Sequence, residues 1–291
     1  GGVVGGGSSR EMVLPDGVWG ALVARIDMLT AAEADLLKCA GILGVEFSVD
    51  MLVQIVDHSK PVMLGLLESI EAQGLVRLLE PGVYTFVYPL QAQVAVSLMM
   101  TSQQEEMHLL VASVYEMEAT DMVPFTAERA THYARAGAAH GIDAAKLFAA
   151  AAEEADAAGA IALAGNYLKE VISLARLNAA VMDQLPVFLA RAAANLMSEA
   201  IDQSGDVAKD EVEAMRSEAH DYAAEALELL KHVSEEAGTS SSGGVVDRPN
   251  GPLLLHGISF SKESKEARER SARDLAKGVL DTLNASTSVA A

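Results

Sequence analysis

The glycine-rich start of the chain comes closest to a chemical motif. Gly2 and Gly7 have the spacing of two glycines in a phosphate-binding loop, in which Lys and then Ser or Thr come next. Ser8 stands at the lysine position, and without an ammonium group there nothing reaches the β and γ phosphates of a nucleotide. Because glycine loses the most backbone entropy on ordering, we interpret residues 1–13 as a flexible linker.

Histidines and carboxylates are the next candidates, because both ligate metal ions. His132, Tyr133 and His140 lie near the start of a helical stretch, but no His, Cys or carboxylate cluster with zinc spacing accompanies them. We therefore predict that His132 is packed or hydrogen-bonded at a helix interface. The acidic groups lack the alternating ligand spacing of a calcium loop and are interpreted as solvated helix faces: Glu153, Glu154, Asp156, Glu211 and Glu213.

Nucleophilic chemistry has no clear candidate either. Cys39, the one cysteine, sits in an apolar helical run, which predicts a buried thiol in a reducing compartment. No paired-carboxylate, Ser-His-Asp or Cys-His arrangement can be nominated from spacing. The sequence therefore nominates no catalytic, cofactor-binding or metal-ligating residue, and we expect this segment to be neither an enzyme nor a cofactor carrier.

Composition and charge indicate which elements hold these residues. The chain has 291 residues, 51% of them apolar but only 4% aromatic, and this Ala-, Leu- and Val-rich mixture suits closely packed helices. Its formal net charge of −20 would repel nucleic acids and anionic lipids. No stretch approaches the roughly 20 apolar residues that span a bilayer, and the start lacks a secretory signal and an initiator Met. We expect a mainly α-helical, cytoplasmic segment of a longer polypeptide without membrane insertion.

Residues 14–120 are expected to form the first folded domain. Helical spacing follows Pro15, and the clearest helix comes next, from Ala34 to Leu43. Thr30 and Glu33 form a capping-box pattern ahead of it, and Gly44 is placed to end it in a left-handed conformation.

Together with the helix from Ala34 to Leu43, the elements that follow it have the order of a winged helix, with three helices and then a hairpin. They are a helix from a Ser48 cap to Asp57, a helix from Ser59 and Pro61 to Gly74, one β-hairpin of residues 75–79 and 83–88 around Pro81-Gly82, and helices over 90–99 and after a Ser102/Glu105 capping box.

Residues 121–237 are helical nearly throughout, and this pattern predicts a tetratricopeptide-like solenoid or bundle. The helices that begin at Phe125 and Ala144 are expected to pair as one repeat unit, and residues 160–174 to begin another. The short connections are expected at residues 138–143, 158–159, 177–183 and 203–207.

The C-terminal part divides into a linker and a helix. Residues 238–260 are rich in Ser and Gly and are predicted to be a disordered linker. Residues 261–285 are predicted to form an amphipathic helix that docks back on the chain or holds a partner helix. Its apolar stripe is expected to comprise Ala272, Leu275, Val279 and Leu283.

A winged helix invites a DNA-binding interpretation, because its recognition helix would enter the major groove. The corresponding helix here, Pro61 to Gln73, carries Glu68 and Glu71 and no basic residue of its own. Only Lys60 and Arg77 flank it, too few cations to offset phosphate repulsion. We therefore predict protein partners and no nucleic acid.

Several motifs, in order along residues 14–175, carry a resemblance to a known family. Leu14 to Val18 and Ala24 to Leu29 look like its "P-x-x-V…ARID-x-L" opening, Ala40 to Phe47 like its "A-x-x-G-x-x-F" helix end, and Leu67 to Val76 like its "L-x-x-L-x-x-x-G-L-I" approach to the wing. Tyr84 to Gln91, His108 to Glu116, Ala130 to Gly137 and Ala160 to Ala175 continue the similarity. The chain resembles the region after the nucleotide-binding core of signal-transduction ATPases with numerous domains, above all the form fused to class III cyclase domains in soluble adenylyl cyclases.

The resemblance implies a winged helix followed by tetratricopeptide-like repeats, in a parent protein whose cyclase and ATPase domains precede residue 1. ATP and Mg²⁺ would belong to those upstream domains. The wing departs from the family pattern "Y-x-F-x-H-x-L-x-Q", because Tyr88 replaces a histidine that is thought to sense nucleotide.

Two functions from different classes follow from this resemblance. The first is a non-catalytic regulatory or scaffolding segment that transmits partner binding to an upstream ATPase or cyclase. The alternative is a structural subunit of a large assembly such as a ciliary axoneme, built from a cyclase-like relic, which would place the protein in a cilium or flagellum.

Overall fold

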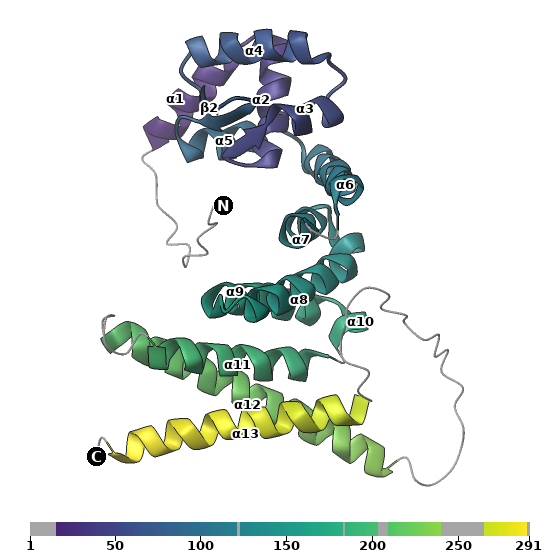
Figure 1. Cartoon of the computed structure of the whole chain (residues 1–291), viewed down its shortest axis with the longest axis vertical. Coiled ribbons are helices and arrows are strands. Elements are labelled where there is room, and N and C mark those ends of the chain that lie inside the picture. Colours follow the sequence, from purple (N-terminus) through teal and green to yellow (C-terminus); the bar gives the residue numbers. More distant parts are fainter. Residues whose placement is uncertain (1–15, 121–122, 183, 203–208, 240–264, 290–291) are drawn as a thin grey trace. The chain divides into compact units, whose positions relative to one another are not determined.

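The computed structural model describes residues 16–120, 123–182, 184–202, 209–239 and 265–289. These residues are mainly α-helical, with one small antiparallel sheet, and the expected mainly α fold class is confirmed. The chain divides into two compact units, residues 1–140 (unit 1) and residues 141–291 (unit 2). Figure 1 shows their elements in sequence colours.

Unit 1 begins with helices, continues through the sheet and ends with a helix pair. Its elements are α1 (Asp16–Asp27), α2 (Ala31–Leu43), β1 (Glu46–Ser48), α3 (Val49–Ile55), α4 (Lys60–Ala72), β2 (Val76–Glu80), β3 (Val83–Phe86), α5 (Pro89–Ser97), α6 (Thr101–Glu118) and α7 (Thr126–Arg135), followed by a short 3₁₀ turn, η1 (Ala138–His140).

The sheet contains the predicted hairpin and one strand that the sequence did not reveal. β2 and β3 form the antiparallel hairpin, with Leu78 opposite Tyr84. β1 pairs antiparallel with the other edge of β3, so the strand order is β1-β3-β2. β1 has three residues, which is too short for an alternating pattern to be recognised.

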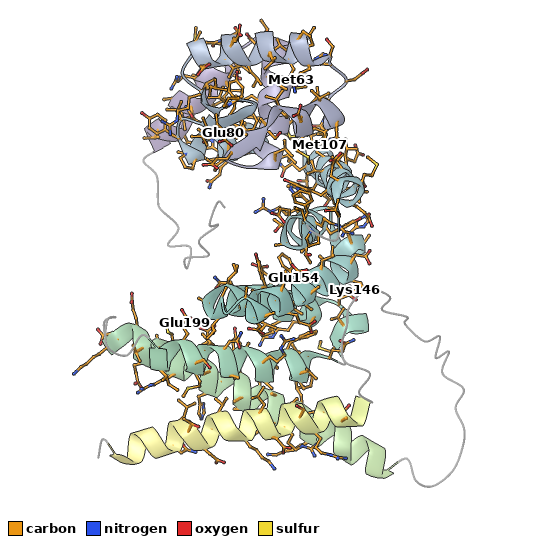
Figure 2. All side chains as sticks on the ribbon, in the orientation of Figure 1. Met63, Glu80, Met107, Lys146, Glu154 and Glu199 are labelled. Carbon is orange, nitrogen blue, oxygen red and sulfur yellow. The ribbon has the colours of Figure 1, made fainter. Side chains whose placement is uncertain are left out.

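The core of unit 1 lies between these helices and the inner face of the sheet. Met63, labelled in Figure 2, and Leu67 point from α4 into this core and are at most 1% exposed. Phe47 on β1 stacks against Tyr84 on β3, with ring centroids 6.2 Å apart. The helices and the hairpin therefore bury one continuous apolar cluster.

The residues that cap α2 were predicted correctly, but the backbone conformation of the C-terminal cap, Gly44, was not. Thr30 Oγ1 accepts a hydrogen bond from the Glu33 amide, and Glu33 Oε2 accepts one from the Thr30 amide at 2.7 Å. Gly44 ends the helix, but its φ of +130° and ψ of −168° lie outside the expected left-handed helical region, in a region open almost only to glycine. Gly74, with φ of +69°, adopts the left-handed conformation after α4.

Two other helix ends in unit 1 differ from the prediction. α3 ends at Ile55 instead of Asp57. The Ser102/Glu105 capping box is wrong, because α6 begins at Thr101 and Gln103 Oε1 accepts a hydrogen bond from the Met100 amide at 3.1 Å instead. Glutamine can fill this role because its side-chain carbonyl reaches back to the N-cap amide as glutamate does.

Unit 2 consists of helices in its described residues. They are α8 (Gly141–Ala157), α9 (Ile161–Leu177), α10 (Ala179–Met182), α11 (Leu185–Asp202), α12 (Lys209–Thr239) and α13 (Lys265–Val289). Gly159, with φ of +75°, makes the sharp turn between α8 and α9, as the predicted connection at 158–159 requires. The predicted connection at 177–183 contains the short helix α10, and the one at 203–207 lies outside the described residues.

Successive long helices of unit 2 pack against one another, and alanine lines many of their contacts. α8 packs on α9, α9 on α11, and α11 on α12. Ala152, Ala164, Ala193 and Ala223 are fully buried, and their small side chains let the helix axes approach closely.

The C-terminal helix docks on α11 and α12, as Figure 1 shows. Its buried stripe comprises Ala272, Ala276, Val279 and Leu283. The predicted member Leu275 is 39% exposed, because the helical stripe passes through its neighbour Ala276. The predicted disordered linker lies outside the described residues except for Gly238 and Thr239, which end α12.

The helix pairing near the unit boundary differs from the predicted repeat. The helices that begin near Phe125 and Ala144 were expected to pair, whereas α7 packs on α6 and α8 packs on α9. The division between the units accordingly falls after His140 and not after residue 120. Buried side chains shared by α6 and α7 explain this difference.

Candidate protein-interaction site

The helix that follows α3, α4, exposes an apolar and acidic side. Four exposed residues, Val62, Gly65, Glu68 and Ala72, define what we call the α4 face. Val62 is 52% exposed, and a Cβ at Gly65 would meet no atom within 4 Å. A second macromolecule could therefore approach this helix closely.

Two of the three cations near α4, Lys60 and Arg25, have partners within unit 1. α4 begins at Lys60, so the prediction that this helix has no basic residue is wrong, but the Lys60 ammonium forms an ion pair with Asp50 at the start of α3. Arg25 on α1 donates hydrogen bonds to the carbonyl oxygens of Gln73 and Gly74 and so caps the C-terminus of α4. Arg77 on β2 is exposed. This arrangement offers little free positive charge for a phosphate backbone.

The edge strand β2 extends the apolar surface beside α4. Leu78 and Leu79 are 50% and 49% exposed. Glu71 Oε1 on α4 accepts a hydrogen bond from the Leu78 amide at 2.9 Å, which joins the helix to the strand. Exposed leucines beside an exposed helix face are typical of a protein-binding surface.

The aromatic residues of β3 and the residues that start α5 have different surroundings. Tyr84 and Phe86 are buried in the core of unit 1, whereas Tyr88 is 59% exposed. Gln91 is fully buried, and its Oε1 accepts a hydrogen bond from the Tyr88 amide at 2.9 Å, which caps α5. Position 88 thus contributes its backbone to a helix cap while its ring faces solvent.

The predicted interface role of His132 is confirmed, and its partner is His108. The two Nδ1 atoms, on α7 and α6, lie 2.9 Å apart, and each residue is 5% exposed. Tyr115 packs against the His132 ring with centroids 5.7 Å apart. Since two nitrogens at this distance share one hydrogen, one ring donates and the other accepts.

Burial keeps both imidazoles neutral at physiological pH. It lowers the pKa of His108 to about 4 and that of His132 to about 3, and the positive charge of Arg135 lowers both further. Sequence reasoning did not identify His108 as this partner. One signal pointed to it, because His108 precedes the buried Val111 and Ala112 at helical spacing and so lies on the inner stripe of α6.

Acidic residues of α8 were only partly predicted correctly. Glu154 and Asp156 are exposed, as expected, whereas Glu153 is half-buried. Arg191 on α11 donates to Asp156 Oδ2 at 3.0 Å and to Glu153 Oε1 at 3.5 Å, so these two carboxylates also bind a neighbouring helix. Glu211 and Glu213 on α12 are exposed, as expected. Over the described ranges, no group of three or more His, Cys, Asp or Glu side chains could hold a metal ion.

Two further ion pairs connect α9 with α12. Lys169 contacts Glu218 at 2.9 Å and Arg176 contacts Glu225 at 2.6 Å. The two pairs are about two helical turns apart, and the residue numbers increase in the same direction along both helices. α9 and α12 therefore run parallel. This is the relation between equivalent helices of successive helical hairpins.

Cys39 is less buried than predicted. The thiol is half-buried on α2 and packs against the core of unit 1. Burial, and next the negative charge of Asp35, raise the pKa of Cys39 to about 11. The thiolate, which is the nucleophilic form, is therefore scarce at neutral pH.

In comparisons with protein families, curated proteins and solved structures, no match to this chain was found. None of the helices within the described residues has both the length and the apolar character needed to cross a membrane.

Proposed function

We propose that this chain is a non-catalytic regulatory segment of a larger cytoplasmic protein of the signal-transduction ATPase and soluble adenylyl cyclase type, and that it works by protein contacts. The observation that carries the proposal is the α4 face. Where a DNA-binding recognition helix would present cations, α4 presents Val62, Gly65 and Glu68, and its one lysine is paired with Asp50. Such a face is suited to a polypeptide partner.

The topology of unit 1 supports a winged-helix assignment. The order α2-β1-α3-α4-β2-β3, with β1 paired to β3, is compatible with a winged helix in which α4 is the recognition helix and the hairpin is the wing. On that basis we propose that the described residues of the predicted first domain, 16–120, form this winged helix.

The packing of unit 2 supports tetratricopeptide-like repeats. α8 with α9 and α11 with α12 form two neighbouring pairs, and ion pairs join α8 to α11 and α9 to α12. Stacked helix pairs of this kind present extended surfaces to other proteins.

The first experiment tests for chemistry. The purified chain is expected to neither hydrolyse ATP nor produce cyclic nucleotide, with ATP and Mg²⁺ acting only in upstream domains. Turnover by the purified chain above the level of a mock preparation would contradict the proposal.

The second experiment tests the α4 face in the intact parent protein. Gly65→Arg is expected to abolish co-purification of the partner, because a long cation would occupy the middle of the face. Gly20→Arg on α1 is the matched control, since a Cβ there also meets no atom within 4 Å. Equal partner recovery with both variants, each folded by circular dichroism, would exclude the α4 face.

A further inference from the structure

α13 packs on one side of α11 and α12, which we call the docking face. The part of α13 that contacts this face is a stripe that includes small residues. We infer that α13 is an exchangeable occupant of this face and that an amphipathic helix of a partner protein takes its place. The inference rests on the proposed function for the existence of such a partner. It goes further by naming a second surface and the helix that fits it.

The stripe of α13 defines what the docking face accepts. Ala272, Ala276, Val279 and Leu283 follow the pattern Ala-x₃-Ala-x₂-Val-x₃-Leu and are all buried. α12 buries apolar residues at the same spacing, namely Ala219, Ala223, Ala226 and Leu230. The docking face therefore suits a helix that has alanines at the first two positions of this pattern and larger aliphatic residues at the last two.

The contact that holds α13 relies partly on small side chains. Two of its four buried stripe residues are alanines, whose single methyl groups remove little apolar area from water. Arg273 Nη2 adds a hydrogen bond to the Leu230 carbonyl oxygen at 3.1 Å. Because α12 and α13 belong to one chain, the contact also benefits from a high effective concentration, which a free helix lacks. A partner helix must therefore bind more strongly than α13 to displace it.

Charge shows how a partner could bind more strongly. α12 carries nine Asp or Glu and three Lys or Arg residues, whereas α13 carries four and five, respectively. α13 is thus a slightly basic helix on an acidic support. The expected partner is a more basic amphipathic helix with the same small-residue stripe, bound in a salt-dependent manner.

The test uses the full chain and a fluorescent peptide of residues 265–289. Ala276→Glu places a charge in the buried stripe of α13 and should release the docking face. Leu275→Glu is the matched control, because this neighbour carries the same new charge at a position that is 39% exposed. By fluorescence anisotropy, the Ala276→Glu chain should bind the peptide at least about tenfold more tightly than the wild-type or control chain, and more weakly as salt is raised.

Each outcome decides the inference. Equal peptide binding by all three chains would overturn it. Loss of hydrogen-exchange protection in α8, α9, α11 and α12 of the Ala276→Glu chain would also overturn it, because α13 would then be a fixed part of the fold. A wild-type dimer that Ala276→Glu converts to a monomer would assign the docking face to α13 of a second copy instead. These measurements need no partner protein, so their failure leaves the α4-face experiments unaffected.

Discussion

At the scale of single residues, Gly41 determines how closely α2 and α5 approach. A Cβ at this position would lie 2.9 Å from Val96 Cγ2 and 3.0 Å from the Ala92 carbonyl oxygen. Real Cβ atoms do not approach other atoms so closely, so a larger residue must push the two helices apart. Because the carbonyl is backbone, it cannot yield by a rotamer change.

Gly41→Val should therefore lower the free energy of unfolding of unit 1 by about 1–3 kcal/mol, measured by urea denaturation. Gly65→Val is the control, since a Cβ there meets nothing within 4 Å, and it should cost nothing or stabilise α4. Equal losses in both variants would show that steric crowding at Gly41 is not the cause.

The buried histidine pair also predicts a pH dependence at this scale. Burial lowers the pKa of His108 to about 4 and that of His132 to about 3, whereas the unfolded chain has ordinary histidine pKa values near 6.5. Below pH 6.5 the unfolded state therefore binds more protons than the folded state. Stability is fully present above pH 6.5 and is lost as the pH falls toward the folded pKa values.

The free energy of unfolding of unit 1 should fall by about 4 kcal/mol between pH 7 and pH 5. The double variant His108→Phe/His132→Leu should remove most of this dependence, as followed by urea denaturation at each pH. An unchanged slope in the double variant would assign the pH dependence to other groups.

At the scale of elements, helix caps act locally and can be compared directly. Thr30 and Glu33 exchange reciprocal hydrogen bonds at the start of α2, and side-chain and backbone hydrogen bonds from Ser69 and Thr30 lower the pKa of Glu33. At the start of α4, the Ser59 side chain makes no cap hydrogen bond. The two N-caps therefore differ in what their hydroxyl groups contribute.

Thr30→Ala should lower the free energy of unfolding by about 1 kcal/mol, because the Glu33 amide loses its acceptor. Ser59→Ala should change it by a few tenths of a kcal/mol at most. Thermal denaturation of both variants provides the measurement, and a larger loss for Ser59→Ala would contradict the assigned caps.

At the scale of the whole molecule, each unit has its own buried side chains. Met63 in unit 1 and Leu168 in unit 2 are fully buried. Because each compact unit contains a core of its own, each should unfold as a separate cooperative transition.

Met63→Ala should lower the opening free energy of unit 1 by about 2–5 kcal/mol and leave unit 2 unchanged, and Leu168→Ala should do the reverse. Hydrogen exchange with mass spectrometry resolves the two units along the sequence. Loss of protection across both units in either variant would show that they unfold as one.

The sequence by itself determined the features that neighbouring residues encode. Helical spacing, the Thr30/Glu33 capping box and the Pro81-Gly82 turn act over a few residues, so the mainly helical class, the α2 cap and the hairpin were predicted correctly. The net charge of −20 follows from the residue types alone, and the sequence motifs alone led us to nominate no catalytic residues.

Only the tertiary structure decided which distant residues meet. β1 exists because β3 offers it an edge, and His108 found its partner through the packing of α6 on α7. Arg191 joins Glu153 and Asp156 to a second helix, and the docking of α13 buries Ala276 in place of Leu275. No local pattern specifies these pairings, because their energy depends on which faces the packed helices present to one another.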